Sequence, residues 1–377
     1  MAAVAAALSL SWVPVRAVAA SATEGIPAYD HVVVLVLENE SFASTFGPGS
    51  PAHYLNGTLV PKGAIDDQYY GTGHVSLDNY IAMTSAQPAN PSTSSDCLGQ
   101  NLYTCAQTTA VSAGGRNLGD QLDDAHRSWA GYMDSMPSPC FHAQYSPTAG
   151  ADQYQGNSTA APAGNYADRH NPFVYYPDIV GNDTRCRAHD VPYTQLSIDI
   201  AGGTVPAFAF ITPDTCHDGH DSPCAGGQAG GLTSADAWLS GNVPPLLDYL
   251  SSHNGLLLVT FDEASTSDTS GCCHGGLGGT PGFGGRVGLL AIGPGVSPGQ
   301  VIHTPYDHAS LLRTVEDVFG ITEHLNNAAP SVPMNDLFAP SAGQVPEAPT
   351  VVLLPLIGLA LVIRRWRSHP ARVVQAH

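Results

Sequence analysis

The sequence predicts an α/β fold with a doubly wound, mostly parallel sheet and helices on both faces. Short apolar runs recur along the chain and are bounded by Gly, Pro or Asp, as buried parallel strands of about four to eight residues are. Stretches with helical periodicity alternate with these runs, which is typical of this fold class. The predicted strands are 31–37, 207–211, 256–261 and 287–292.

Four helices are predicted at 76–85, 118–133, 235–252 and 308–319. The stretch from about 135 to 190 differs, because it is rich in Pro, Gly, Asn, Asp and Tyr and has little periodicity. It predicts a long loop-rich insert, held by Cys140 and Cys186, that serves as a lid or specificity element or is a plain surface excursion. Residues 23–343 then form one large domain of about 320 residues.

The charge balance excludes some classes of function. The chain has 377 residues and a formal net charge of −19, with 32 acidic against 13 basic side chains, so a nucleic acid is not an expected partner. Lys62 is the only lysine, and five of the 12 arginines lie in the terminal segments. Because so few basic residues remain, the sequence favours a metalloenzyme over an enzyme that holds an anion with arginines.

The first 22 residues resemble a secretory signal peptide. An apolar stretch from Ala2 to Val15 precedes two sites that satisfy the small-x-small cleavage rule, 17–19 and 20–22. A disordered Ala-rich leader is the alternative. The signal-peptide interpretation predicts a protein that is secreted or displayed at the cell surface.

The C-terminal segment, 344–377, carries a second targeting signal. A Pro-Glu-Ala-Pro stretch, 346–349, is followed by an apolar run, 351–363, and then by Arg364, Arg365 and Arg367. This order resembles bacterial C-terminal sorting signals of the PEP type, and a single-pass membrane anchor is the alternative. Both interpretations place the domain outside the cytoplasm and allow membrane attachment through the tail. The sequence carries no signal for an oligomeric state.

The eight cysteines agree with export, because an even number in an exported chain favours disulfides. Local pairing is expected between Cys97 and Cys105 and between Cys216 and Cys224. A thiolate zinc site is not expected, because close CxxC pairs are absent and the adjacent Cys272 and Cys273 do not suit one ion.

Oxygen donors follow two of the predicted strands where each strand ends. Glu38 and Asn39 come after the first strand, and Asp262 and Glu263 come after the strand at 256–261. These donors predict one divalent metal ion at the carboxyl edge of the sheet, with Ca²⁺, Mg²⁺ or Mn²⁺ favoured and Zn²⁺ also in the candidate set. The alternative is that the acidic residues only form loops.

A third cluster follows the strand at 207–211. Residues 214–221 hold three aspartates and two histidines, which suits a second metal, or phosphate contact and protonation of a leaving group. A disulfide-closed acidic surface loop is the alternative. His308, after the helix N-cap candidate Asp307, is placed to face an anion. Ser76 offers a hydroxyl just past a glycine turn.

Five ordered segments carry a family resemblance. ENESF, GHVSLDNYIAMTS, FITPDTCHDGHD, VTFDEA and TPYDHASLLRTVEDVFGI span about residues 30–321. In this order they resemble the phosphoesterase family of acid phosphatases and phospholipases C, within the alkaline-phosphatase-like superfamily.

The resemblance implies roles for individual residues. Ser76 falls at the position of the nucleophile, Asn79 would donate its amide to a phosphoryl oxygen, and His220 or His308 would protonate the leaving group. His74 either contacts substrate or only shapes the turn, and His217 is assigned to substrate contact from its place in the cluster 214–221. Val75 and Asp78 depart from the family pattern, which often has proline at both positions. The metal ligands implied are Glu38, Asn39, Asp218, Asp262 and Glu263.

Three functions follow from these assignments. The leading one is a secreted, metal-dependent phosphatase that hydrolyses phosphomonoesters through a phosphoserine, acting on a phosphorylated small molecule or a lipid head group. A phospholipase C-type phosphodiesterase is the alternative. A non-catalytic surface protein that keeps the metal as a structural clip is the third.

Overall fold

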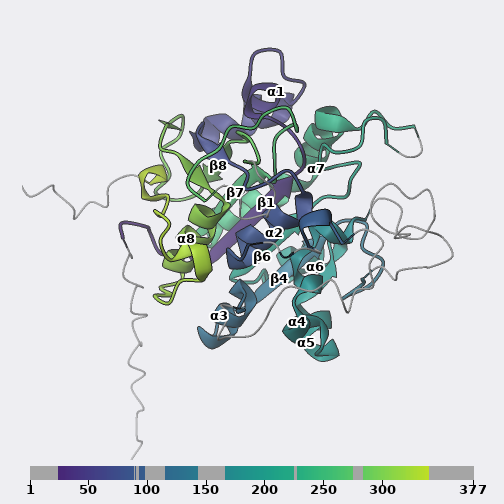
Figure 1. Ribbon diagram of the computed structural model, residues 1–377, viewed down its shortest axis with the longest axis vertical. Helices are drawn as coiled ribbons and strands as arrows, with labels where there is room; N and C mark the ends of the chain where they lie inside the picture. Colours follow the sequence, from purple (N-terminus) through teal and green to yellow (C-terminus); the bar gives the residue numbers. More distant parts are fainter. Residues whose placement is uncertain are drawn as a thin grey trace, which may run out of the picture. The chain divides into compact units, whose positions relative to one another are not determined.

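The computed structural model describes residues 24–88, 90, 93–97, 115–142, 166–224, 227–274 and 283–338. Figure 1 shows the central sheet with helices packed around it. The predicted signal peptide, the C-terminal tail and Cys105 lie outside the described residues, so the expectations placed on them remain predictions. In the described part of the chain, no helix combines the length and apolarity needed to cross a membrane.

The main sheet is mixed and mostly parallel, as predicted. The five strands from β5 to β7 run parallel, whereas β8 is antiparallel to both of its neighbours, β7 and β2. A short second sheet pairs β10 (Tyr306–Asp307) with β3 (Tyr69–Tyr70). In spatial order the main sheet contains β5 (Asp190–Pro192), β4 (Trp129–Met133), β6 (Phe208–Thr212), β1 (His31–Leu37), β7 (Gly255–Phe261), β8 (Leu289–Ile292), β2 (Ala64–Asp66) and β9 (Val301–Ile302).

The core is centred on β1, which has the predicted bounds. It pairs with β6 on one side and β7 on the other, and Val32 to Leu37 are at most 1 % exposed. A strand that is covered on both faces favours a continuous apolar run over an alternation of apolar and polar residues, which explains the sequence VVVLVL. Because β1 and β7 pair in register from His31 with Gly255 to Leu37 with Phe261, both strands end at the same level.

The helices form packed groups around this sheet. The contacts pair α2 with α8 and α6 with α7, and α7 also packs on β7. The helices are α1 (Phe42–Phe46), α2 (Ser76–Ser85), α3 (Leu118–Asp124), α4 (Pro177–Val180), α5 (Asp183–His189), α6 (Thr194–Gly202), α7 (Gly231–Ser252) and α8 (His308–Val318). Shorter turns are a π-helical one at Leu55–Leu59 and 3₁₀ turns at Val60–Lys62, Thr93–Ser95, Asp168–His170, Pro172–Tyr175, Asn326–Ala328 and Asn335–Leu337.

The helix predicted at 118–133 is wrong in its second half. Asn117 starts α3 with a capping box, but the helix ends at Asp124 and His126 takes a left-handed φ of 54°. The following WAGYM sequence becomes β4, which pairs with β5 and β6. Strand pairing with distant segments therefore overrides the helical pattern read locally.

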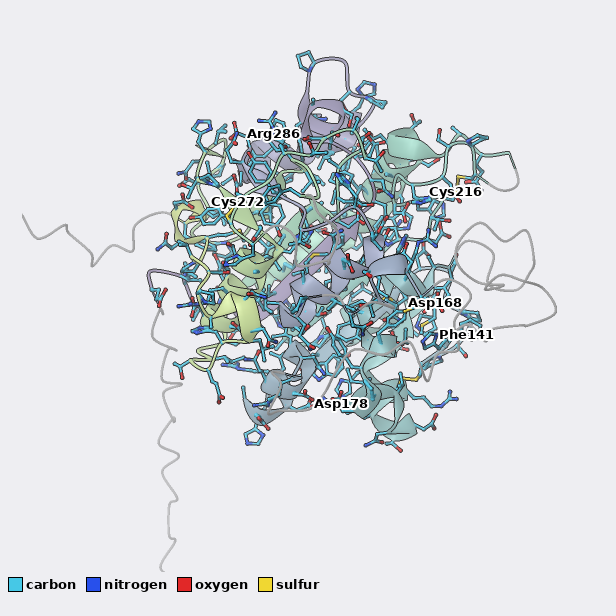
Figure 2. The ribbon with its side chains drawn as sticks, in the orientation of Figure 1. Phe141, Asp168, Asp178, Cys216, Cys272 and Arg286 are labelled. Atoms are coloured by element: carbon cyan, nitrogen blue, oxygen red, sulfur yellow. A yellow bond between two sulfur atoms is a disulfide. The ribbon has the colours of Figure 1, made fainter. Side chains whose placement is uncertain are left out.

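The predicted insert contains more regular structure than expected. The described part of it holds the 3₁₀ turns Asp168–His170 and Pro172–Tyr175 followed by α4 and α5, while 143–165 lie outside the described residues. The disulfide Cys140–Cys186 closes this region, as predicted. Two further disulfides are the predicted Cys216–Cys224 and the adjacent pair Cys272–Cys273. Figure 2 shows the side chains around these elements.

Candidate active site

Three strand ends bring carboxylates together at one edge of the sheet. Glu38 follows β1 and Asp262 follows β7, and the Asp262 amide donates to the Leu37 carbonyl at 2.9 Å. The Glu38 amide donates to the Asp218 carbonyl at 2.9 Å, which ties the loop after β6 to the same edge. Asn39 turns the chain with a φ of 54°, a conformation that asparagine tolerates better than most residues.

A tight turn places Ser76 beside these carboxylates. Gly71 packs so closely that a Cβ there would lie 2.7 Å from the Asp262 carbonyl oxygen. Ser76 is the first residue of α2, is 4 % exposed, and its Oγ donates to Glu38 Oε2 at 3.1 Å. The hydroxyl is therefore aimed at the acidic strand ends and lies at a helix N-terminus, where partial positive charge favours an anion.

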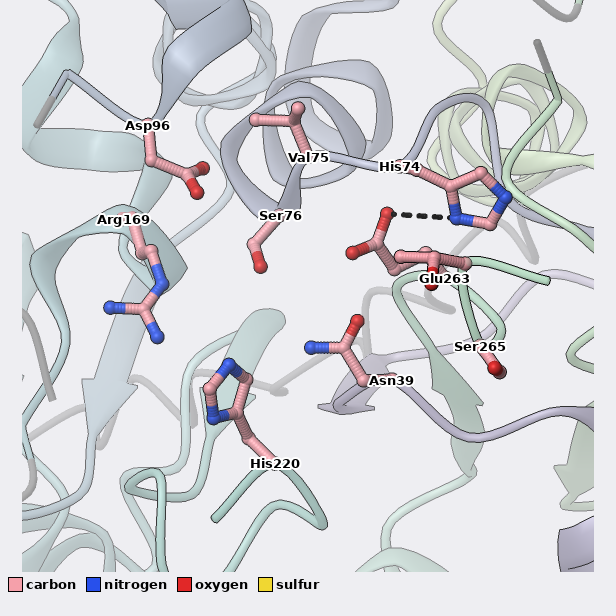
Figure 3. Close-up of a pocket in the computed structure, with 10 residues that line it drawn as sticks. Asn39, His74, Val75, Ser76, Asp96, Arg169, His220, Glu263 and Ser265 are labelled. Carbon is pink, nitrogen blue, oxygen red and sulfur yellow. Dashed lines mark ion pairs between the residues drawn. The ribbon is translucent and has the colours of Figure 1, made fainter. Parts of the chain in front are cut away.

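A cavity of about 570 Å³ opens above this serine (Figure 3). The predicted residues Ser76, His74 and His220 all line it, together with side chains that the sequence did not single out. The full lining is Asn39, His74, Val75, Ser76, Asp96, Arg169, His220, Glu263, Ser265 and Thr266. The structure thus brings the predicted nucleophile, one predicted acid and two predicted metal ligands to one pocket.

The carboxylates at the strand ends are held with raised pKa values. Burial is the main cause for Glu38, Asp218 and Asp262, all 0 % exposed, and the negative charge of Glu38 raises the pKa values of the other two further. Burial also raises the pKa of Glu263 to about 7, although His74 opposes this shift. Such a concentration of buried acidic groups is unfavourable unless a cation balances it.

His170 lies between two of these carboxylates. Its Nε2 is 3.3 Å from Glu38 Oε1, its Nδ1 is 3.3 Å from Asp218 Oδ2, and its ring stacks on Tyr80. Burial, and then the charge of Arg169, lowers the pKa of His170 well below its usual range, so the imidazole is neutral. A neutral imidazole has one nitrogen that carries a proton and one that carries a lone pair. The lone pair and the carboxylate that it faces repel each other, and a cation bound between the two would remove this repulsion.

Several buried polar atoms at this edge make no hydrogen bond, and their types suit a divalent cation. Both ring nitrogens of His170 and one carboxylate oxygen each of Asp218, Asp262 and Glu263 are buried and make no hydrogen bond. Asn39 donates its amide to Glu38 at 3.1 Å, which leaves its carbonyl oxygen as a donor to a metal. This set contains four of the five predicted metal ligands and adds His170. The fifth, Glu38, lies beside them, and both of its carboxylate oxygens accept hydrogen bonds. Oxygen-rich donors of this kind suit a hard cation, and the imidazole also suits Zn²⁺.

A separate cluster holds His217 away from the pocket lining. Ligand atoms of Asp134, Asp214 and His217 lie within 4.8 Å of one another. Hydrogen bonds to the two carboxylates raise the pKa of His217 to about 10, so the imidazolium itself supplies the positive charge. Trp238 donates to the same Asp134 oxygen that His217 contacts, and Ser135 donates to the second oxygen of Asp214. We therefore interpret this cluster as an ion-pair network, and His217 does not contact the pocket as predicted for a substrate-binding residue.

Two other predicted residues have contacts that differ from their expected roles. Asn79 Nδ2 donates to the carbonyls of Gly73 and Val75, at 3.0 and 3.2 Å, so its amide holds the turn before Ser76 and does not point to a phosphoryl oxygen. His308 is 0 % exposed, and its ring nitrogens contact the Tyr69 hydroxyl and the Asp262 carbonyl, at 2.8 and 2.6 Å. Of the two histidines predicted as the acid, only His220 lines the pocket.

Three residues at the site were missed from the sequence. His170 and Arg169 come from the 3₁₀ turn Asp168–His170, and Asp96 accepts a hydrogen bond from the Leu77 amide, in the first turn of α2. The local signal is the RHNPFVYY stretch, 169–176, which also resembles the family but carries no assigned role for Arg169 or His170; the Asn171 side chain caps the next turn. A stretch of this kind does not reveal which strand ends it faces.

Asp78 is a buried acid without a counter-charge. It is 1 % exposed, and neither carboxylate oxygen has a hydrogen-bond partner. Burial, with smaller contributions from Asp96 and Glu263, raises its pKa to about 8. This residue departs from the family pattern, and the structure gives it a neutral, protonated carboxyl at neutral pH.

The raised pKa of Asp78 predicts a pH-dependent stability. The folded protein keeps a proton that the unfolded chain, with a pKa of about 3.9, has released, so stability falls as pH rises from about 4 to about 8. Asp78→Asn is expected to remove up to about 1.4 kcal/mol per pH unit of this slope. Urea unfolding at several pH values would measure it, with exposed Asp183→Asn as the control. Equal slopes in wild type and Asp78→Asn would contradict the assignment.

The fold is similar to that of a solved structure from the alkaline phosphatase superfamily. A protein of that superfamily from Vibrio parahaemolyticus aligns with a TM-score of 0.50 at 13 % identity, covering 78 % of this chain and 67 % of that chain. The lipoteichoic acid synthase LtaP from Listeria monocytogenes also aligns with a TM-score of 0.50, at 14 % identity, over 85 % of this chain and 79 % of that chain. At these identities the likeness concerns the fold alone.

The family follows from the sequence match. The model of the Phosphoesterase family matches residues 50–322, and the chain belongs to this family and is a phosphoric ester hydrolase. A phosphatidylinositol-3-phosphatase of Mycobacterium tuberculosis is 26 % identical over 86 % of this chain and 89 % of that protein. A probable acid phosphatase of Kluyveromyces lactis is 28 % identical over 77 % of this chain, which spans 58 % of the yeast protein.

Proposed function

We propose that the protein is an exported, metal-dependent phosphatase of the acid-phosphatase type that hydrolyses phosphomonoesters through a phosphoserine at Ser76. One observation supports this proposal most directly. The Ser76 hydroxyl lies 3.1 Å from Glu38 Oε2, at the floor of a pocket that His220 also lines. A nucleophile and a proton donor therefore face one space large enough for a phosphoryl group, and a buried proton acceptor contacts the nucleophile.

The proposed mechanism also uses a divalent metal ion. A divalent cation held by Glu38, Asn39, Asp218, Asp262, Glu263 and His170 would act as a Lewis acid that stabilises negative charge on the serine oxygen and the phosphoryl group. The Tyr80 hydroxyl donates to Glu38 Oε1 at 2.6 Å, and the backbone N–H of Asn39 donates to Asp262 Oδ1 at 3.0 Å. These contacts fix the orientation of both carboxylates.

The first step transfers the phosphoryl group to the protein. Ser76 Oγ forms a bond to phosphorus while the bond from phosphorus to the ester oxygen breaks. Glu38 Oε2 takes the serine proton, and the His220 imidazolium gives a proton to the leaving oxygen. The Nδ1 of His220 lies 2.8 Å from Asp221 Oδ1, so this carboxylate orients the ring.

The second step returns the protein to its starting state. A water molecule attacks phosphorus and gives one proton to His220, while the bond from phosphorus to Ser76 Oγ breaks. The proton on Glu38 returns to the serine oxygen, and inorganic phosphate is released. Each residue therefore ends in the protonation state in which it began.

The pocket chemistry indicates a polar substrate. Ser265 and Thr266 add hydroxyl groups to the wall, and Asp96 and Glu263 add carboxylates. A phosphorylated small molecule or a phosphorylated lipid head group fits these walls, and the name of the mycobacterial relative points to phosphoinositides. The net charge of −19 disfavours nucleic acids.

Export of the protein rests on its cysteines and its predicted leader. Three disulfides occur in the described part of the chain, and disulfides of this kind persist in oxidising compartments. The leader 1–22 and the tail 344–377 are proposed as a signal peptide and as a sorting signal or anchor. The protein is accordingly proposed to act outside the cytoplasm or at the cell surface.

The phosphoserine can be tested by trapping it. Acid quenching during turnover of para-nitrophenyl phosphate is expected to leave one phosphoryl group on the peptide that contains Ser76, because acid stops the second step. Peptide mass spectrometry would locate it, and the same peptide from Ser76→Ala is the control. Turnover with no labelled peptide, or with the label on another residue, would contradict the proposed nucleophile.

A further inference from the structure

Arg169 is a buried cation on the wall of the pocket. It is 5 % exposed, and in the described part of the chain it is the only lysine or arginine that lines the cavity. In Figure 3 its guanidinium lies between Asp96 and His220 and faces the Ser76 hydroxyl across the pocket. The sequence composition favoured a metal over an arginine as the anion-binding group, yet the fold brings one of the few arginines to this point.

The position of Arg169 is fixed by its backbone. It occupies the middle of the 3₁₀ turn Asp168–His170, which packs against α2, the helix that starts at Ser76. The Asn171 amide closes this turn with a hydrogen bond of 2.8 Å to the Asp168 carbonyl. The backbone of Arg169 therefore belongs to an element that packs against the helix of the proposed nucleophile, and its side chain is buried and does not extend from the surface.

The surrounding charges keep Arg169 positive. Burial opposes its charge, but nearby carboxylates more than compensate and raise the pKa of the guanidinium; the carboxylates are Asp96, Glu38, Asp218 and Asp168. The same carboxylates make the pocket unfavourable for an anion. A substrate with two negative charges is repelled more strongly than one with a single charge, so a fixed positive charge on the wall matters most for the dianion.

We propose that Arg169 binds the non-bridging oxygens of a phosphomonoester dianion and thereby selects monoesters over diesters. This inference rests on the proposed function of the pocket and deepens it. A guanidinium donates two parallel hydrogen bonds to two free phosphoryl oxygens. A monoester has three such oxygens, whereas a diester has one replaced by a second ester group and carries one charge fewer. Arg169 thus distinguishes the acid-phosphatase reaction from the phospholipase C reaction within one site.

The test compares one monoester with one diester. Arg169→Ala is expected to lower kcat/KM for para-nitrophenyl phosphate about 100-fold or more, in the range seen when one donor to a developing anion is removed. The loss for bis(para-nitrophenyl) phosphate is expected to stay below about tenfold. Inhibition by inorganic phosphate should weaken in parallel with the monoester reaction. Added guanidinium ion should restore part of the activity on the monoester.

Two further variants distinguish a loss of substrate binding from a folding defect. Arg169→Lys keeps the charge but loses the two-pronged geometry, so it is expected to lie between wild type and Arg169→Ala on the monoester. Arg187→Ala is the matched control, because this exposed arginine pairs with Asp183 on α5 and does not line the pocket. It should leave both reactions unchanged. Thermal unfolding of each variant shows whether the fold is kept, and if Arg169→Ala does not fold, Arg169→Lys carries the comparison.

The outcomes separate this inference from the proposed function. Equal losses on both substrates in a folded Arg169 variant, with unchanged inhibition by phosphate, would overturn the role of Arg169 while activity that depends on Ser76 still stands. If Ser76→Ala is as active as wild type, the proposed function itself fails. A selective loss on the monoester, partly rescued by guanidinium, supports both.

Discussion

Replacing Ser76 with alanine is expected to lower kcat for para-nitrophenyl phosphate about 10⁴-fold or more, the scale of loss seen when a covalent nucleophile is removed. The physical reason is that Ser76 Oγ donates to Glu38 Oε2, at 3.1 Å, and alanine leaves no oxygen at this position. Ser265 and Thr266 also line the pocket, but neither has a hydrogen bond to Glu38. Steady-state kinetics of purified wild type and Ser76→Ala would measure the loss.

The control and a second substrate make the Ser76 result decisive. Ser240→Ala removes an exposed hydroxyl that bonds only within α7, to the Ala237 carbonyl, and should leave kcat unchanged. Assays on phosphatidylcholine beside para-nitrophenyl phosphate separate a phosphodiesterase from a monoesterase. Equal activity of Ser76→Ala and wild type on the monoester would leave a non-catalytic role for the serine.

Much of the site could be predicted because parallel strands end at a common edge. Glu38 and Asp262 follow apolar runs that are easy to recognise, and in-register pairing of β1 and β7 places them together. Asp218 joins them through the Glu38 amide. The strands that were recognised are the long, doubly covered ones, in which burial on both faces produces an unbroken apolar sequence.

The missed parts depend on contacts between distant segments. The run that forms β4 is predicted as part of a helix, and becomes a strand because β5 and β6 offer it hydrogen bonds on both sides. His170 reaches Glu38 and Asp218 from a turn that has no periodicity. No pattern within a short window specifies such contacts.

The histidines illustrate the same limit. His308 and His220 both occur beside an aspartate in the sequence, and both suit an acid. The fold separates them, because α8 buries His308 against Asp262 whereas the loop after β6 turns His220 into the pocket. For His308, burial lowers the pKa to about 4, which removes the proton that a general acid needs at neutral pH.

Asp262→Asn is expected to have opposite effects on metal binding and on the stability of the metal-free protein. The change keeps an oxygen to accept the Asn39 amide, as Oδ1 does now at 3.0 Å, but removes a buried negative charge. Affinity for a divalent ion should fall more than about 100-fold, because even indirect partners of a metal contribute 10–100-fold. We expect kcat/KM for the monoester to fall about 10³-fold with it.

Without metal, the same substitution should stabilise the protein. Asp262 Oδ2 is buried with no hydrogen-bond partner, and the pKa of Asp262 is raised first by burial and then by Glu38 and Glu263. Repulsion among these carboxylates opposes folding unless a cation balances it, so Asp262→Asn should raise the melting temperature in EDTA while lowering it in excess metal. Metal analysis and thermal unfolding measure both effects, with exposed Asp248→Asn as the control. A melting temperature that falls equally with and without metal would show that Asp262 supports the fold and not a cation.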